Sequence, residues 1–185
     1  MSTLLGFAPF IVFALFDSRL GVVPALGAAA VLSAIVLVWG RLEHKRSVKL
    51  LEIGTLLLFG GLALYAIATH TDWSLVAVRL RVDAGLLIVV LVSMAVRQPF
   101  TLQYAKEQVP PEVWALPSFM KINNLLTAVW ALAFGLMVLS DLAMVYLPTV
   151  PLWVGVAVTV VAIAGAIWFT AWYPKRVRAR LRTQS

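Results

Sequence analysis

The sequence contains no cysteine and few charged residues. Without cysteine, the chain can form no disulfide or thiolate metal site and carries no prenyl or palmitoyl anchor. Charged residues make up only 12% of the chain and hydrophobic residues 62%, whereas soluble domains are about 45–50% apolar. The mean hydropathy is +0.96. This balance excludes an ordinary water-soluble domain and indicates a polytopic membrane protein.

Catalytic and cofactor motifs are missing as well. There is no P-loop, HExxH or GxSxG motif, and no histidine pair placed to hold a haem or a quinone. His44 and His70 are expected to be solvated loop residues rather than metal ligands, because no second set of ligands accompanies either. We therefore expect no enzymatic activity, no cofactor and no metal.

Long apolar runs divide the chain into about six expected transmembrane helices. A helix needs roughly 20 apolar residues to cross about 30 Å of hydrocarbon. The alternation of apolar and polar residues typical of membrane β-strands is absent. The expected fold is an all-α bundle in a single transmembrane domain. Its helices are expected at about residues 3–17, 20–40, 50–69, 76–97, 124–147 and 152–173, with an interfacial loop at 98–123 and a basic tail at 174–185.

Positive charge is concentrated in alternate connections. Residues 41–49, 97–121 and 175–182 hold all but three of the fifteen basic residues. By the positive-inside rule, these connections and both termini are expected in the cytoplasm, which agrees with six crossings. The net charge of +7 then reflects topology rather than nucleic-acid binding. The basic tail is also expected to attract anionic lipid, at about 1 kcal/mol for each basic residue near the surface.

Four charged residues are expected in the outer half of the membrane. Arg79, Arg81 and Asp83 open the fourth helix, and Asp141 lies near the outer end of the fifth. Both carboxylates are expected about 10 Å inside the apolar layer, where charges usually face the protein interior and find partners. The spacing predicts pairing of Arg79 with Asp83 and allows Arg81 to reach Asp141. Three interpretations remain open: a cluster that fixes helix packing, an outward cleft for a lipid head group or partner segment, and a proton or ion path.

The longest connection is expected to lie flat on the inner face of the membrane. Its prolines, Pro110 and Pro111, separate two short amphipathic pieces, and the following Asn residues are expected to cap the next helix. Six residues are candidates for an inner-face contact surface: Gln98, Pro99, Phe100, Trp114, Asn123 and Asn124.

Two smaller patterns concern helix packing. Glu52, near the inner end of the third helix, is expected to pair with Lys49 or Lys121. Gly60 and Gly61 offer small faces of the kind that allow membrane helices to approach closely.

Short motifs spread along the chain resemble the bacterial inner-membrane septation protein A family. The resemblance rests on "FAPFIVF" (7–13), "RLR" (79–81), "RQP" (97–99), "VW" (113–114), Asn123-Asn124 and "VWALAF" (129–134). It implies a small helical protein of the bacterial inner membrane that takes part in envelope maintenance and in division-site or wall-synthesis assemblies. It implies no catalytic residues.

The expected function is therefore a non-enzymatic membrane scaffold in the cell envelope. Its expected partners are membrane lipids and other membrane proteins, a homo-oligomer being an open alternative, with no nucleic acid. The main rival is a small transporter or channel that uses the charged residues of the outer half. A third interpretation is an accessory subunit of a larger membrane complex.

Overall fold

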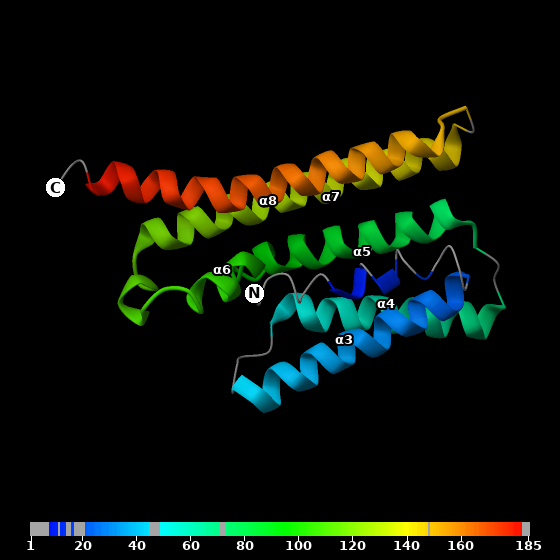
Figure 1. The fold of residues 1–185 in the computed structure, drawn as a ribbon, viewed down its shortest axis with the longest axis horizontal. Helices are drawn as coiled ribbons and strands as arrows, with labels where there is room; N and C mark the ends of the chain where they lie inside the picture. Colours follow the sequence, from blue (N-terminus) through cyan, green and yellow to red (C-terminus); the bar gives the residue numbers. More distant parts are fainter. Residues whose placement is uncertain are drawn as a thin grey trace. The chain divides into compact units, whose positions relative to one another are not determined.

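The regular structure is helical throughout the part of the chain that this computed structural model describes, and the expected all-α class is confirmed there (Figure 1). The described residues are 8–10, 12–13, 16, 21–44, 49–70, 73–147 and 149–182. Most of the expected first helix, residues 3–17, therefore lies outside them.

The chain divides into two compact units, Met1–Val89 and Val90–Ser185. The described helices of the first unit are α3 (Val22–His44), α4 (Leu50–Thr69) and most of α5 (Leu75–Ala95). The second unit contains the end of α5, α6 (Phe100–Lys106), a short 3₁₀ helix η1 (Pro111–Val113), α7 (Pro117–Tyr146) and α8 (Leu152–Arg182).

Phe59 of α4 lies at the centre of the first unit and is fully buried. The rings of Phe10 and Phe13 pack against it, with centroids 5.0 and 5.8 Å away. Each helix contributes one stripe of residues to this core, because side chains three or four positions apart share a helix face. The buried members are Phe13, Ala25, Leu26, Ala29, Phe59, Ala63, Val78 and Val82.

Two glycines allow α4 and α5 to approach closely. Val89 packs against Gly54, where an added Cβ would lie 2.7 Å from its methyl carbons, and Leu58 packs against Gly85 so tightly that an added Cβ would overlap it. In contrast, a Cβ added to Gly60 or Gly61 would meet nothing within 4 Å. The close contact between these helices therefore depends on glycines other than the pair that the sequence suggested.

In the second unit, α7 and α8 lie side by side and antiparallel (Figure 1). Aromatic rings form its core: Trp130 lies 6.2 Å from Phe100 and 5.8 Å from Phe134, between ring centroids. The indole N–H of Trp130 donates a 3.1 Å hydrogen bond to the hydroxyl of Thr170, which links α7 to α8.

Two expected boundaries are wrong in this unit. Within the expected interfacial loop at 98–123, α6 occupies the short piece before Pro110 and Pro111, and η1 and the first turns of α7 follow. Helix α7 begins at Pro117 instead of 124, since proline suits the first helical position, where no N–H is needed. The basic tail is not a separate segment, because α8 continues through Pro174 to Arg182.

Among the residues that the structure describes, four helices are long and apolar enough to cross a membrane: Val22–Leu42, Leu50–Thr69, Pro117–Tyr146 and Leu152–Val177. Helix α5 has 21 residues, about 31 Å at 1.5 Å per residue, and is therefore long enough as well. What separates α5 from these four is the three charged residues in its first half.

Candidate functional site

The three charged side chains of α5 lie in different environments. Asp83, two turns into the helix, is buried with 7% of its surface exposed. Arg79 is partly buried and Arg81 is exposed. Pairing of Arg79 with Asp83 stays a prediction from their spacing of four residues. Of these three charged side chains, only that of Asp83 is buried.

Arg81 belongs to a stack of side chains near the beginning of α5. Its guanidinium carbon lies 4.4 Å from the centroid of the Trp73 ring, and Trp73 stacks on Tyr65 with centroids 5.6 Å apart and planes at 15°. The Nη1 atom of Arg81 also donates to the carbonyl oxygen of Ala77 at 2.6 Å. The face of an aromatic ring attracts the positive charge of a guanidinium that lies over it. The sequence gave no sign that Trp73 would contact Arg81.

Asp141 lies on the buried stripe of α7, with only 1% of its surface exposed. Met137 and Met144, one turn before and after it, are buried on the same stripe. A carboxylate among methionines in a membrane helix is costly, and such groups usually serve packing or function. Arg81 belongs to the first unit and Asp141 to the second, so their pairing stays a prediction.

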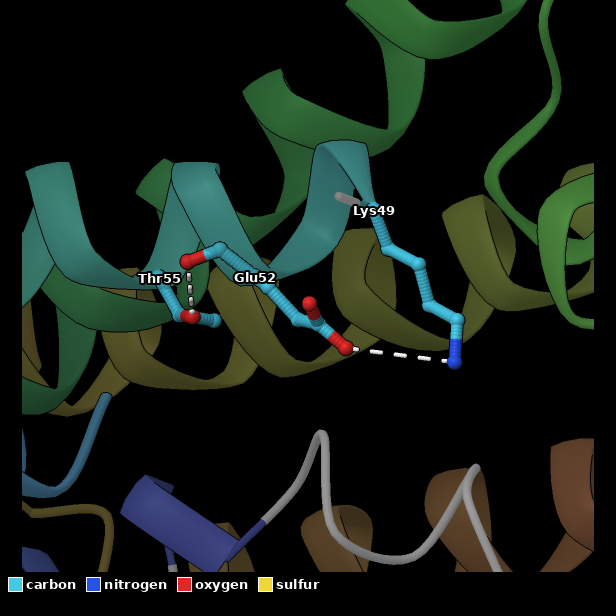
Figure 2. Close-up of polar contacts among 3 residues, drawn as sticks. All are labelled: Lys49, Glu52 and Thr55. Atoms are coloured by element: carbon cyan, nitrogen blue, oxygen red, sulfur yellow. Dashed lines mark hydrogen bonds and ion pairs between the residues drawn. The ribbon is translucent and has the colours of Figure 1, made fainter. Parts of the chain in front are cut away.

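Lys49 and Glu52 form an ion pair at the beginning of α4 (Figure 2). Lys49 Nζ lies 3.9 Å from Glu52 Oε1, and the two side chains are 3% and 14% exposed. The hydroxyl of Thr55 donates a 3.0 Å hydrogen bond to the backbone oxygen of Glu52 (Figure 2). The expected pairing of Glu52 with Lys49 is therefore confirmed. The ion pair allows a lysine to be buried at the N-terminus of α4, a helix that is apolar enough to cross a membrane.

The expected inner-face contact surface is only partly exposed. Gln98, Trp114 and Asn124 are exposed, as such a surface requires. Pro99, Phe100 and Asn123 are buried, so they do not form part of it. The asparagines also do not cap α7, because they lie two turns inside it.

Asn123 instead belongs to a buried polar junction between α6 and α7. The hydroxyl of Thr101 donates to the backbone oxygen of Asn123 at 2.9 Å and lies 2.8 Å from the hydroxyl of Thr127. The Asn123 amide nitrogen donates to the backbone oxygen of Phe119 at 2.8 Å. Buried hydrogen bonds of this kind fix the position of a short helix that apolar packing alone would leave free to slide. We assign the junction a structural role.

The connection from α5 to α6 is a compact corner. The N–H of Gln98 donates to the oxygen of Ser93, and the N–H of Arg97 donates to that of Met94, the pattern of a Schellman cap. Arg97 has a φ of 57°, in the left-handed region usually occupied by glycine. The Ser93 hydroxyl then accepts the N–H of Phe100 at 3.2 Å. The "RQP" motif therefore terminates α5 and starts α6.

Aromatic and basic residues follow one another at the end of α8. Trp168 and Trp172 stack with centroids 5.2 Å apart, and the guanidinium carbon of Arg176 lies 5.0 Å from the Trp172 ring centroid. Phe169 and Tyr173 form a parallel stack beside them, also at 5.2 Å. Trp and Tyr prefer the level of the lipid head groups, so these residue types are typical of a membrane interface.

The charged residues do not assemble into a metal site within the described part of the chain, where no three His, Asp or Glu side chains come together. Comparison with family models, with curated proteins and with solved structures found no match for this chain.

Proposed function

We propose that this chain is a non-enzymatic scaffold of the bacterial inner membrane that assembles with transmembrane helices of other proteins. In this proposal it crosses the membrane six times with both termini in the cytoplasm, as the positive-inside rule requires of the three basic clusters. Membership of the septation protein A family, and a role in division or wall-synthesis assemblies, form part of the proposal and depend on the motifs described above.

The observation that carries the proposal is the exposure of α8. Only 11% of its most apolar stretch is buried, compared with 33% for α7. The exposed residues include Val156, Val160 and Val161, and an added Cβ on Gly165 would meet nothing within 4 Å. Branched apolar residues beside a glycine provide the close-packing surface that membrane helices use for association.

A second apolar surface lies on α3. Ala34, Ile35, Val38, Trp39 and Leu42 line a shallow groove, and Leu42 is 79% exposed. A scaffold with two such surfaces can contact two partners at once. An accessory subunit of a larger complex would use the same surfaces, so partner identification is the decisive experiment.

Site-specific photocrosslinking in native membranes tests the proposal. A photoreactive amino acid at Val160 or Val161 on α8 is expected to give the same protein adduct from both positions, and capture through that partner should recover this chain. A photoreactive amino acid at the buried Ala166 is the matched control and should give no adduct. If both exposed positions reacted with lipid alone, the scaffold function would be wrong.

Transport is the second candidate function. The burial of Asp83 and Asp141 in apolar helices favours it, since intramembrane carboxylates often form part of proton or ion paths. Purified protein in liposomes should then carry a proton or cation flux that Asp141→Asn abolishes. The scaffold function instead predicts no flux above that of protein-free liposomes.

A further inference from the structure

We infer that the end of α8 binds the head group of an anionic phospholipid. The proposed site consists of Trp168, Trp172 and Arg176, which lie at successive turns of one helix face, together with Lys175. This inference does not depend on the scaffold function, because the surface proposed for partner helices is centred one to three turns before Trp168.

The geometry of the stack presents donors to a phosphate. Trp172 lies between Trp168 and Arg176, with the ring planes of the two tryptophans only 13° apart. A guanidinium held against a ring keeps its outward N–H groups for a bidentate contact with phosphate oxygens. In the described structure the indole N–H groups of Trp168 and Trp172 donate no hydrogen bond, and Trp168 is 61% exposed.

The charge around the stack also suits an anion. Lys175 and Arg176 are both exposed, and neither pairs with a carboxylate among the residues that the structure describes. The sequence contains no acidic residue after Asp141, although five basic residues lie between 175 and 182. A neutral or zwitterionic head group would leave this positive charge unbalanced.

The aromatic rings point to a lipid rather than a soluble phosphate. The aromatic residues Trp168, Phe169, Trp172 and Tyr173 lie in the part of α8 where its apolar stretch gives way to basic residues. Trp and Tyr occupy this position at the membrane interface. A phospholipid whose phosphodiester lies at that level has its acyl chains in the bilayer beside the apolar part of α8. The helix therefore presents its cations where lipid phosphates lie.

Native mass spectrometry of the full chain in detergent tests the site. Phosphatidylglycerol and phosphatidylcholine with identical acyl chains are the two probes. The expected result is at least fivefold tighter binding of phosphatidylglycerol to the unaltered chain. Arg176→Gln should weaken this binding about fivefold, the effect of one cation near an anionic surface, and leave phosphatidylcholine binding unchanged.

Two further variants distinguish a defined lipid-binding site from non-specific attraction of anionic lipid to any exposed cation. Lys121→Gln removes an exposed cation of α7 without a stacked ring and should weaken phosphatidylglycerol binding less than twofold. Trp172→Leu should weaken it two- to fivefold, because the guanidinium loses the ring that positions it. Unfolding temperatures in lipid-free detergent verify that each variant is folded, and Arg176→Met, which also removes the cation, replaces Arg176→Gln if that variant fails to fold. Equal binding of the two lipids, or equal losses for the Arg176 and Lys121 variants, would overturn the inference.

Discussion

The guanidinium of Arg81 lies 4.4 Å from the centroid of the Trp73 ring, so a residue from the α4–α5 connection contacts a charged side chain of the helix that follows. The Arg81 side chain is exposed, and its Nη1 also bonds the backbone of its own helix. The guanidinium of Arg81 therefore has two attractive contacts within the first unit, one with an aromatic ring and one with a backbone carbonyl.

We expect Trp73→Leu to lower the free energy of unfolding in detergent by about 1–2 kcal/mol, because both the cation–π contact and the stacking on Tyr65 are lost. Trp73→Phe should lower the free energy of unfolding less, since an aromatic ring remains at this position. Trp153→Leu is the control, because Trp153 is 69% exposed. In a double-mutant cycle, Trp73→Leu and Arg81→Gln should together cost less than the sum of their separate effects. Strict additivity would contradict the contact.

Replacement of Gly85 should displace the Leu58 side chain in the contact between α4 and α5. Gly85→Ala places a methyl group against Leu58, and overpacking of this kind typically costs about 1–3 kcal/mol. Gly61→Ala is the matched control, because its methyl group meets nothing within 4 Å and alanine favours a helix by up to about 1 kcal/mol. Thermal unfolding should therefore shift in opposite directions for the two variants. A Gly85→Ala protein as stable as the parent would show that the helices do not pack this closely.

The ion pair of Lys49 and Glu52 predicts that each residue depends on the other. Lys49→Met should cost about 1–3 kcal/mol of unfolding free energy, because the mostly buried Glu52 carboxylate loses a charged partner. Lys49→Met combined with Glu52→Gln should cost less than the sum of the two single changes. Lys121→Met removes an exposed lysine and serves as the control. Equal destabilisation by Lys49→Met and Lys121→Met would show that burial of the pair contributes nothing.

Arg97→Gly should stabilise the protein by about 1 kcal/mol, because glycine adopts the left-handed conformation at φ 57° without the penalty that a Cβ brings. Arg97→Val should destabilise it, since a β-branched residue is least suited to this conformation. Arg41→Gly is the control: Arg41 lies within α3, where glycine costs about 1 kcal/mol. Chemical denaturation in mild detergent measures all three. A loss of stability with Arg97→Gly would mean that the arginine side chain contributes more than its backbone strain costs.

Local features of this protein were predictable from the sequence. The helix Leu50–Thr69 begins and ends at the expected residues, because its apolar run is bounded by basic and polar segments. The pairing of Lys49 with Glu52 was also predictable, because residues three positions apart at the start of a helix lie on one face. The charges of α5 were also correctly placed near the beginning of a helix.

The candidate contact surface was only half predictable, because burial depends on neighbours that are distant in the sequence. Phe100 and Asn123 were candidates for the contact surface because they lie in the long connection expected at 98–123. In the structure, α6 packs against α7, and both residues are buried. The same holds for glycine: Gly60 and Gly61 are adjacent and conspicuous, but Gly54 and Gly85 face large side chains across the α4–α5 contact.

The helical class, the lengths of the apolar segments and the distribution of charge were predictable without the structure, since each follows from residues close together in the chain. Only the folded structure shows that Arg81 lies on Trp73, that Asn123 is buried and that Gly54 and Gly85 face side chains of a neighbouring helix. The physical reason is that a side chain's partner is set by helix rotation and by packing against neighbouring elements, and many rotations satisfy the same apolar pattern when the helix lies in a membrane.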